Sequence, residues 1–272
     1  MEAPIGIFDS GVGGLTVARE LFKLLPQEDV VYFGDVGRSP YGGRSKEIIS
    51  VFAQQDVSFL LEHRVKYIVC ACNTVSAVAL DDLTKHFQVK MVGVIEPGAK
   101  AAIERTRTGR VGVIGTVATI TSNAYARVMH DLDPKIKVFS LACPLFVPLA
   151  EEGYINKEAT YLIARDYLKT MKDVEVDTLI LGCTHYPLLK PVIADTMGEA
   201  VTLIDSGEET ARVAQRILHD EGLLNINVTQ RPGVASEHKF FVSDVPEKFS
   251  QVATRFLGES VENITRVDIS RY

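Results

Sequence analysis

Residues 5–25 read IGIFDSGVGGLTVARELFKLL and contain the unit that recurs along the chain. The run from Ile5 to Phe8 is apolar and uncharged, which is typical of a strand covered on both faces. Small and polar residues follow at 9–14, and Pro26 closes the segment. Between them, apolar residues recur at helical spacing: Leu15, Ala18, Leu21, Phe22 and Leu25. The stretch therefore predicts a strand, a loop and an amphipathic helix.

The same alternation continues through the rest of the chain. Short runs rich in Ile, Val and Leu predict further strands at 30–33, 67–71, 91–94, 110–114, 136–141, 178–181, 201–204 and 239–242. A second amphipathic helix has a predicted apolar face of Ile48, Phe52, Phe59 and Leu60. Strands that alternate with helices predict an α/β fold with doubly wound, mostly parallel sheets.

The pattern restarts near the middle of the chain, which indicates two α/β domains. Glu96-Pro97-Gly98 interrupts the alternation after the fourth predicted strand, and a second break lies at residues 205–207. We expect residues 1–95 together with 207–272 to form the first domain, and residues 96–206 to form the second.

Two strand ends resemble each other and suggest pseudo-symmetry between these domains. YIVCACNT at 67–74 and LILGCTH at 179–185 are both apolar runs that end in a cysteine followed by small polar residues. Cys72 and Cys183 lie 111 positions apart (183 minus 72), so each predicted domain contributes one.

Composition excludes several classes of protein. With 272 residues, 46% hydrophobic and 24% charged, the chain has the content of a globular protein and not of a disordered one. Its four cysteines are too irregularly spaced for a disulfide scaffold, and its first residues do not form a basic, then apolar, signal. We therefore expect a cytoplasmic, reduced protein with free thiols.

Nucleic acid and membrane are not expected partners. The formal net charge is -6, and no run of Lys and Arg forms a basic stripe. The most apolar stretch, 67–80, is interrupted by polar residues and is shorter than the roughly 20 residues that cross a bilayer.

In open α/β sheets the ligand lies beyond the carboxyl ends of the strands, so the residues there are the first candidates for function. Gly11-Val12-Gly13-Gly14 precedes a helix but matches neither dinucleotide nor Walker phosphate loops. A carboxylate fits this loop better than a nucleotide does, because helix amino ends favour negative charge.

Cys72 and Cys183 are the strongest candidates for chemistry. A cysteine that ends a strand is commonly only a small buried hydrophobe. Here each one precedes a helical segment and polar neighbours, which is an environment that stabilises a thiolate. We interpret Cys70 and Cys143 as packing residues. Cys-x-Cys at 70–72 lacks a second pair of ligands, so no metal site is expected.

Three other residues suit proton transfer. A lone histidine is commonly structural, but His185 follows Cys183 by two positions and suits a proton partner of that thiol. Asp9 and Glu151 have ordinary interpretations as a helix cap and a surface acid. Asp9 ends the first predicted strand, where it can serve Cys72.

Taken together, these motifs resemble the bacterial glutamate racemases of the aspartate/glutamate racemase superfamily. The matching motifs are Asp9-Ser-Gly-Val-Gly-Gly14, Pro40-Tyr41-Gly42, Cys72-Asn73-Thr74, Cys143 to Pro148 with Glu151, and Gly182-Cys-Thr-His-Tyr-Pro187. The resemblance implies two α/β domains with the active site in the cleft between them. It also implies a cofactor-independent, two-base racemase of L- and D-glutamate, usually a homodimer, that supplies D-glutamate for peptidoglycan.

The resemblance also assigns expected roles to individual residues. Cys72 and Cys183 correspond to the two proton-transferring thiols, assisted by Asp9 and by His185 with Glu151. Substrate-binding or thiol-supporting positions are Asp9, Ser10, Pro40, Tyr41, Gly42, Asn73, Thr74, Thr116, Thr119, Thr184 and His185.

Other functions remain open at this point. The nearest are an aspartate racemase and a one-cysteine decarboxylase of the same superfamily, although the paired cysteines argue against the decarboxylase. A noncatalytic module that binds an acidic amino acid is the alternative from a different class. It would bind glutamate and leave the Cα proton unexchanged.

Overall fold

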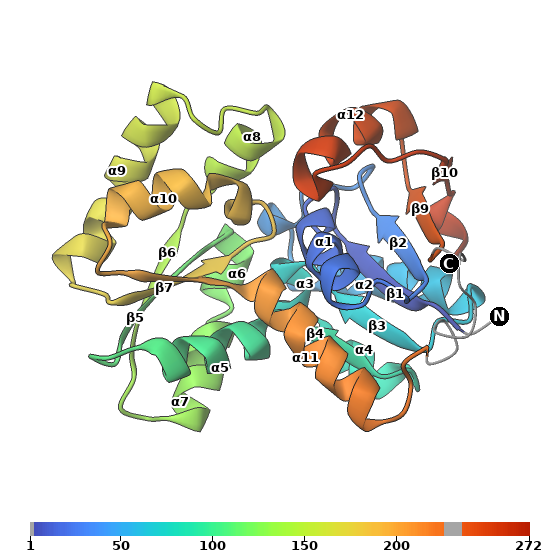
Figure 1. Ribbon diagram of the computed structural model, residues 1–272, viewed down its shortest axis with the longest axis horizontal. Coiled ribbons are helices and arrows are strands. Elements are labelled where there is room, and N and C mark those ends of the chain that lie inside the picture. The colour runs from blue at the N-terminus through green and yellow to red at the C-terminus, as the bar shows by residue number, and fades with distance from the viewer. Residues whose placement is uncertain (1–2, 226–235) are drawn as a thin grey trace.

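Two parallel β-sheets, each covered by helices, form the two lobes of the chain (Figure 1). The computed structural model describes residues 3–225 and 236–272. Its strands are β1 (Ile5–Asp9), β2 (Val30–Gly34), β3 (Tyr67–Cys70), β4 (Met91–Gly93), β5 (Arg110–Gly115), β6 (Lys137–Ala142), β7 (Thr178–Gly182), β8 (Thr202–Asp205), β9 (His238–Val242) and β10 (Ile264–Arg266).

Helices connect successive strands. They are α1 (Leu15–Leu24), α2 (Lys46–Glu62), α3 (Asn73–Val78), α4 (Leu80–His86), α5 (Ile95–Arg105), α6 (Val117–Thr121), α7 (Ala124–Leu132), α8 (Phe146–Glu151), α9 (Glu158–Asp173), α10 (Lys190–Met197), α11 (Ser206–Asp220) and α12 (Pro246–Leu257). In the described parts of the chain, three connections contain two helices each: α3 with α4, α6 with α7, and α8 with α9. Short 3-10 turns are η1 (Tyr41–Gly43), η2 (Tyr186–Leu189) and η4 (Ile269–Arg271).

The two sheets share a strand order. The six-stranded sheet runs β10-β9-β2-β1-β3-β4, and the four-stranded sheet runs β6-β5-β7-β8. Neighbouring strands in both sheets are parallel. The order β2-β1-β3-β4 in the first corresponds to β6-β5-β7-β8 in the second. The predicted α/β class with two doubly wound, pseudo-symmetric units is therefore confirmed.

The nine predicted strands are all present, and no end differs by more than one residue. β10 is not predicted by the sequence, because Ile264–Arg266 has only three residues and two of them are exposed. The predicted buried face of α2 is wrong at Ile48, which is 44% exposed. Ile49 is fully buried in its place, while Phe59 and Leu60 are buried as predicted.

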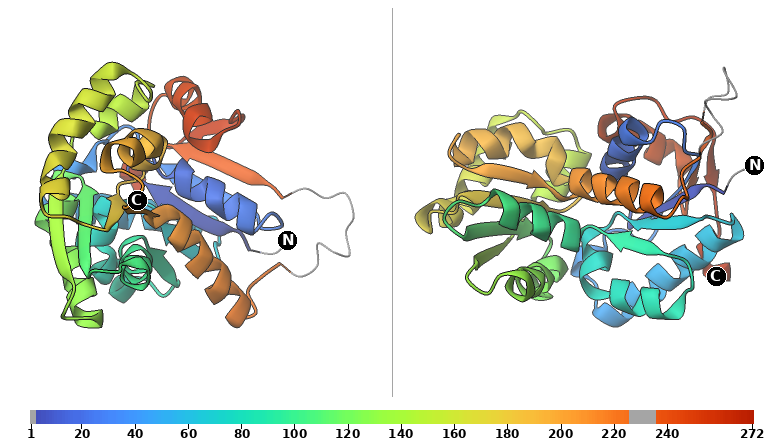
Figure 2. Two further views of the ribbon diagram at one scale, coloured as in Figure 1. Left: turned by 60° about the vertical axis from the view of Figure 1, so that its left-hand side comes forward. Right: turned by 60° about the horizontal axis from the view of Figure 1, so that its bottom comes forward.

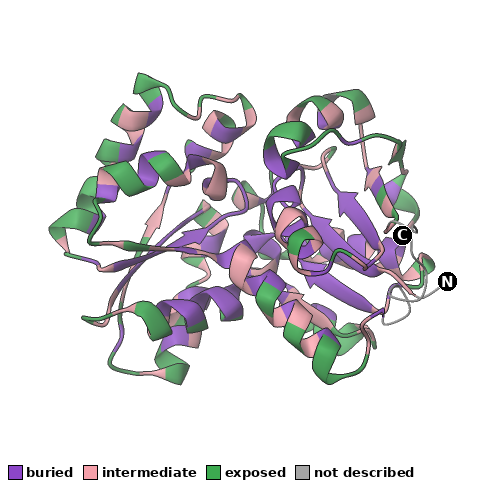
Figure 3. Cartoon of the chain, in the orientation of Figure 1, coloured by how far each residue is buried: buried purple, intermediate pink, exposed green. Residues whose placement is uncertain are grey.

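Burial follows the layers of the fold, as Figure 3 shows. Every residue of β1, β2, β3 and β7 is buried. The outer faces of the helices are exposed (Figure 3). These four strands lie inside their sheets, and the ends of β1, β3 and β7 contribute to the site described below.

The lobes are joined by helix packing as well as by the chain. α11 contacts α1 in the six-stranded lobe and α5 in the four-stranded lobe. Figure 2 shows α11 and α5 side by side at this junction. Sheet membership changes between β4 and β5 and again between β8 and β9. No helix within residues 3–225 and 236–272 has the length and apolar character to cross a membrane.

Candidate active site

The site lies where the same ends of both sheets meet. In each sheet the connections leave in opposite directions from the first strand, which makes a topological switch point between β1 and β3 and another between β5 and β7. Ser10 follows β1 and Cys72 follows β3; Thr116 follows β5 and Cys183 follows β7. Ligands of open α/β sheets bind at such points.

These strand ends enclose one cavity of about 220 Å³. Its lining residues come from both lobes: Ser10, Ser39, Pro40, Tyr41, Gly42, Gly43, Cys72, Asn73, Thr74, Thr116, Val117, Pro144, Val147, Pro148, Cys183, Thr184 and His185. The structure thus brings eleven of the sequence-predicted residues to one cavity. Asp9, Thr119 and Glu151 do not line it.

Sequence reasoning missed six lining residues. Ser39 and Gly43 flank the Pro40-Tyr41-Gly42 motif, and Val117 follows Thr116. The other three, Pro144, Val147 and Pro148, belong to the motif that begins at Cys143. These six residues could have been predicted from their closeness in sequence to the motifs, but not from their residue types.

Cys72 is the thiol of the six-stranded lobe. It is 4% exposed and precedes α3 as its N-cap. Its Sγ donates to Oγ of Ser10 at 3.4 Å. Burial and then the negative charge of Asp9 raise the pKa of Cys72 to about 12, although the Ser10 hydroxyl opposes them. Cys72 is therefore a protonated thiol at neutral pH.

Asp9 is a fully buried carboxylate behind the cavity wall. Its Oδ2 accepts from the amide of Gly11 at 3.0 Å. Within the described residues its Oδ1 has no hydrogen-bond partner. Burial raises the pKa of Asp9, although the charge of His185 and the amides of Gly14 and Gly11 act against it. Asp9 is therefore suited to accept a proton.

The glycine loop at residues 11–14 leaves room for the Asp9 side chain and for the close packing of the four-stranded lobe. A Cβ on Gly14 would lie 2.5 Å from Cβ of Asp9, and one on Gly13 would lie 2.2 Å from Oγ1 of Thr184. The first amides of α1, from Leu15 to Val17, donate to carbonyls of the loop itself. The Gly11 amide of this loop thus contacts the protein's own carboxylate, Asp9.

Cys183 is the thiol of the four-stranded lobe, and His185 lies beside it. Sγ of Cys183 is 3.8 Å from Nδ1 of His185, and Nε2 of His185 is 2.9 Å from Oε1 of Glu151. Burial disfavours the charged imidazole, but the hydrogen bonds and charges of Cys183 and Glu151 outweigh it and raise the pKa of His185 to about 10. A protonated imidazole beside a sulfur is the arrangement that stabilises a thiolate.

The six-stranded lobe reaches over this histidine through α12. The ring of Phe256 contacts the His185 ring edge-on, with centroids 5.1 Å apart. The guanidinium of Arg255 donates to the carbonyl oxygen of Glu151. The histidine and its carboxylate are therefore held by both lobes.

Threonine hydroxyls join the lobes at the cavity. Oγ1 of Thr74 lies 3.0 Å from Oγ1 of Thr116 and 3.4 Å from Oγ1 of Thr119. Thr119, although it does not line the cavity, contacts Thr116 at 3.0 Å. Thr16 donates to the carbonyl of Thr184 at 2.9 Å. The bonds of Thr74 and Thr16 cross between the lobes and hold them together at the cavity.

Tyr41 presents its ring and backbone to the site, because its hydroxyl is already bonded. The hydroxyl contacts the carboxylates of Asp35 and, at 3.2 Å, Asp56. Burial and the charges of these two carboxylates raise the pKa of Tyr41, so the phenol stays protonated. The amides of the Tyr41–Gly43 turn remain as groups that can contact a ligand.

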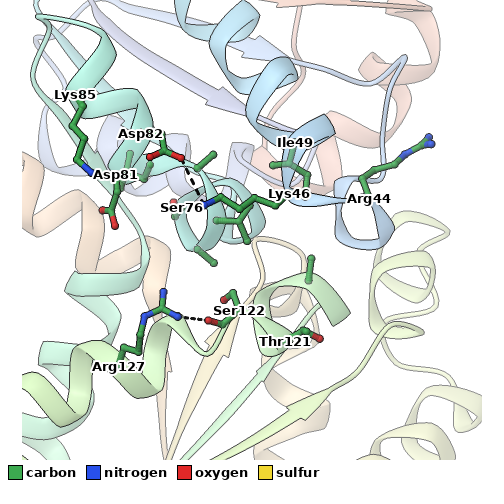
Figure 4. Close-up of a pocket in the computed structure, with 15 residues that line it drawn as sticks. Arg44, Lys46, Ile49, Ser76, Asp81, Asp82, Lys85, Thr121, Ser122 and Arg127 are labelled. Carbon is green, nitrogen blue, oxygen red and sulfur yellow. Dashed lines mark hydrogen bonds and ion pairs between the residues drawn. The ribbon is translucent and has the colours of Figure 1, made fainter.

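A second cavity, of about 440 Å³, lies beyond α3 and α6 (Figure 4). Ser76, at the middle of α3, lines it, whereas Asn73 at the start of the same helix lines the first cavity. Figure 4 shows Lys46 paired with Asp82, at 3.7 Å. Neither Cys72 nor Cys183 lines this second cavity.

The site offers acid and base groups. In the part of the chain that the structure describes, no group of three or more His, Cys, Asp or Glu is arranged to hold a metal ion. The four cysteines all lie in that part and are buried free thiols. Fold and site together define an α/β protein in which two lobes each bring one thiol to a shared cavity.

Comparison with known proteins identifies the family. The profile of the Asp/Glu/Hydantoin racemase family matches residues 36–214. The glutamate racemase of Geobacter metallireducens is 51% identical over 265 residues, which are 97% of this chain and 96% of the relative. The chain therefore belongs to the Asp/Glu/hydantoin racemase family, with glutamate racemases among its similar relatives.

Solved structures agree with this assignment. A glutamate racemase isoform from Bacillus anthracis has a TM-score of 0.93 and 42% identity, covering 98% of this chain and 97% of its own. The glutamate racemase of Francisella tularensis, solved in complex with D-glutamate, has a TM-score of 0.92 and 39% identity, covering 100% and 99%.

Proposed function

We propose that the chain interconverts L-glutamate and D-glutamate by moving the Cα proton between Cys72 and Cys183, without a cofactor. The observation that carries this proposal is that the two thiols line one cavity and come from different lobes. Inversion of a carbon centre needs a base on one face and an acid on the other. The isomerase activity and its substrate are those of the full-length relatives.

The two thiols have different surroundings. Cys72 has a raised pKa and carries its proton, whereas Cys183 lies beside the protonated His185. In one direction Cys183 removes the Cα proton and Cys72 delivers one to the opposite face. Microscopic reversibility exchanges these roles in the other direction. Asp9 assists Cys72, and His185 with Glu151 assists Cys183.

The Cα proton of an amino acid is a very weak acid, and no electron sink helps to remove it without a cofactor. Catalysis then depends on positioning, desolvation and hydrogen bonds to the substrate. Groups proposed to hold glutamate are the polar side chains of Ser10, Asn73, Thr74 and Thr184 and the turn Pro40-Tyr41-Gly42, with Thr116 and Thr119 supporting them.

The remaining expectations belong to the same proposal. The lobes are taken as domains, 1–95 with 207–272 and 96–206, so that the site is an interdomain cleft. A homodimer follows from the resemblance to the family. Two thiols that must stay reduced fit the cytoplasm, because oxidation of either would stop the reaction. The D-glutamate formed would supply peptidoglycan.

Racemisation of L- and D-glutamate by purified protein, without added cofactor, tests the proposal. Cys72→Ser and Cys183→Ser should each lose at least about 10³-fold in kcat, since each removes an essential acid or base. Cys70→Ser and Cys143→Ser are matched controls for the loss of a buried thiol outside the cavity lining. Full turnover by either cavity variant would contradict the two-thiol assignment.

The same assay separates the alternatives. Faster turnover of aspartate than of glutamate would identify the protein as an aspartate racemase. Release of CO₂ would indicate a decarboxylase. Glutamate binding without Cα exchange would leave a noncatalytic binding module.

A further inference from the structure

The side-chain amide of Asn73 has a hydrogen-bond partner at its oxygen and none at its nitrogen among the described residues. Its side chain is 3% exposed and lines the cavity directly after Cys72. Oδ1 accepts a hydrogen bond from the Tyr125 hydroxyl at 2.7 Å. Nδ2 is buried and has no hydrogen-bond partner among the described residues. A buried amide donor without an acceptor is costly, so this group needs a partner that the protein itself does not supply.

Tyr125 belongs to the opposite lobe from Asn73. It lies in the first turn of α7, which packs on α5 in the four-stranded lobe, whereas Asn73 begins α3 in the six-stranded lobe. Tyr125 is 2% exposed and does not line the cavity. The hydrogen bond between them therefore crosses the junction of the lobes behind the cavity wall.

The position of the Tyr125 ring is fixed by two glycines and a serine. A Cβ on Gly182 would lie 3.2 Å from the ring, and one on Gly98 would lie 3.4 Å from it. Ser206, whose hydroxyl donates to the Leu181 carbonyl at 3.1 Å, is close enough to lower the pKa of the Tyr125 hydroxyl. Larger residues at either glycine would displace the ring and its hydroxyl.

Tyr125 remains a hydrogen-bond donor over the whole range in which the protein is assayed. Burial raises the pKa of Tyr125 above its usual value, although the neighbouring Ser206 opposes this. A protonated hydroxyl donates to an oxygen, so it selects the amide orientation in which Oδ1 faces Tyr125. The two hydrogens of Nδ2 then point away from Tyr125.

We infer that Tyr125 is a positioning residue that locks the Asn73 amide so that Nδ2 donates to a carboxylate oxygen of glutamate. Tyr125 does not touch the substrate; it acts through Asn73. Because it reaches Asn73 from the other lobe, the binding group is correctly oriented only when the lobes are closed. This inference rests on the proposed function, which supplies the carboxylate.

The test is a double-mutant cycle on KM for glutamate with Tyr125→Phe and Asn73→Ala. Tyr125→Phe keeps the ring and removes only the hydroxyl, so KM should rise about 5- to 10-fold and kcat should fall less. In the Asn73→Ala background the same change should alter KM by less than about 2-fold, because Tyr125 then has nothing to orient.

Stability separates positioning from packing. Tyr186→Phe removes an equally buried hydroxyl, which donates to the Cys143 carbonyl at 2.8 Å, and it gives the Tm cost of losing such a bond in this protein. Tyr125→Phe should lose a similar amount of Tm and, in addition, show the rise in KM.

Wild-type KM in a folded Tyr125→Phe protein, or additive effects in the double variant, would overturn the positioning role. If Tyr125→Phe does not fold, Gly98→Ala crowds the same ring, and an unchanged KM there overturns the role equally. Failure of the wild-type protein to racemise glutamate would instead defeat the proposed function.

Discussion

His185 donates through Nε2 to Oε1 of Glu151 at 2.9 Å, and its other ring nitrogen lies 3.8 Å from the sulfur of Cys183. The carboxylate therefore acts on the thiol through the ring. Among the described residues, no imidazole contacts Cys72. Its neighbours are instead the Ser10 hydroxyl and the buried Asp9 carboxylate. The pseudo-symmetric lobes thus surround their two thiols with different chemistry.

Glu151→Gln should lower kcat/KM about tenfold. The glutamine oxygen can still accept from Nε2, but the negative charge that supports the protonated ring is lost. Because enantiomers have equal free energy, the fall must be the same in both directions. Initial rates from L- and D-glutamate measure it. Glu152→Gln, an exposed neighbour with the same change of charge, is the control and should match the wild type. Equal activity of both variants would contradict the role of Glu151.

The free energy of unfolding should decrease as pH rises, over a pH range set by the pKa of His185. Its pKa is raised from 6.5 to about 10 in the folded protein, so the folded state holds a proton that the unfolded state releases. The stabilisation is complete below about pH 6.5 and is lost as pH rises to about 10. Urea unfolding at several pH values measures this. His185→Gln should show a flatter dependence, and an identical dependence would contradict the shift.

Asp9→Asn should lower the pKa of Cys72. Burial is the larger cause of the raised pKa, and the Asp9 charge is the next, so removing the charge should move ionisation to lower pH without restoring the usual value. The pH dependence of alkylation at Cys72, followed by peptide mass, measures the change. Asp82→Asn, an exposed change of the same kind on α4, is the control. Identical profiles for wild type and Asp9→Asn would show that burial alone sets the pKa.

Gly13→Ala should keep the lobes from closing. The new Cβ would lie 2.2 Å from Thr184 Oγ1 and 2.5 Å from the His185 ring, so one side of the site must move. Such overpacking costs about 1–3 kcal/mol of stability. Activity should fall much more than Tm, because the His185 ring that is displaced is the partner of Cys183. A variant with wild-type kcat/KM would contradict this close approach.

Much of the fold can be predicted from sequence because the inner strands are uncharged and apolar, while their helices are amphipathic. The positions of Cys72 and Cys183 follow from the same pattern, since parallel strands end at one edge of a sheet. β10 could not be predicted, because three residues with two exposed give no such pattern. Ile48 was assigned to the wrong face because Ile49 beside it is equally apolar.

Contacts between the lobes cannot be predicted from local sequence patterns. Tyr125 lies 52 positions from Asn73, and Arg255 lies 104 positions from Glu151. Neither pairing follows from periodicity, because each depends on how two separate units pack. For the same reason, the sequence could not show that Asp9 and Glu151 lie behind the cavity lining and act through their neighbours.

The most direct test of the two-thiol account is the isotope content of the first product formed in deuterated water. If Cys72 and Cys183 act from opposite faces, D-glutamate formed from L-glutamate carries deuterium at Cα, while the remaining L-glutamate keeps its hydrogen. The reverse reaction should give the mirror-image result. Product that retains the substrate's own Cα hydrogen would mean that a single base serves both faces and would contradict the account.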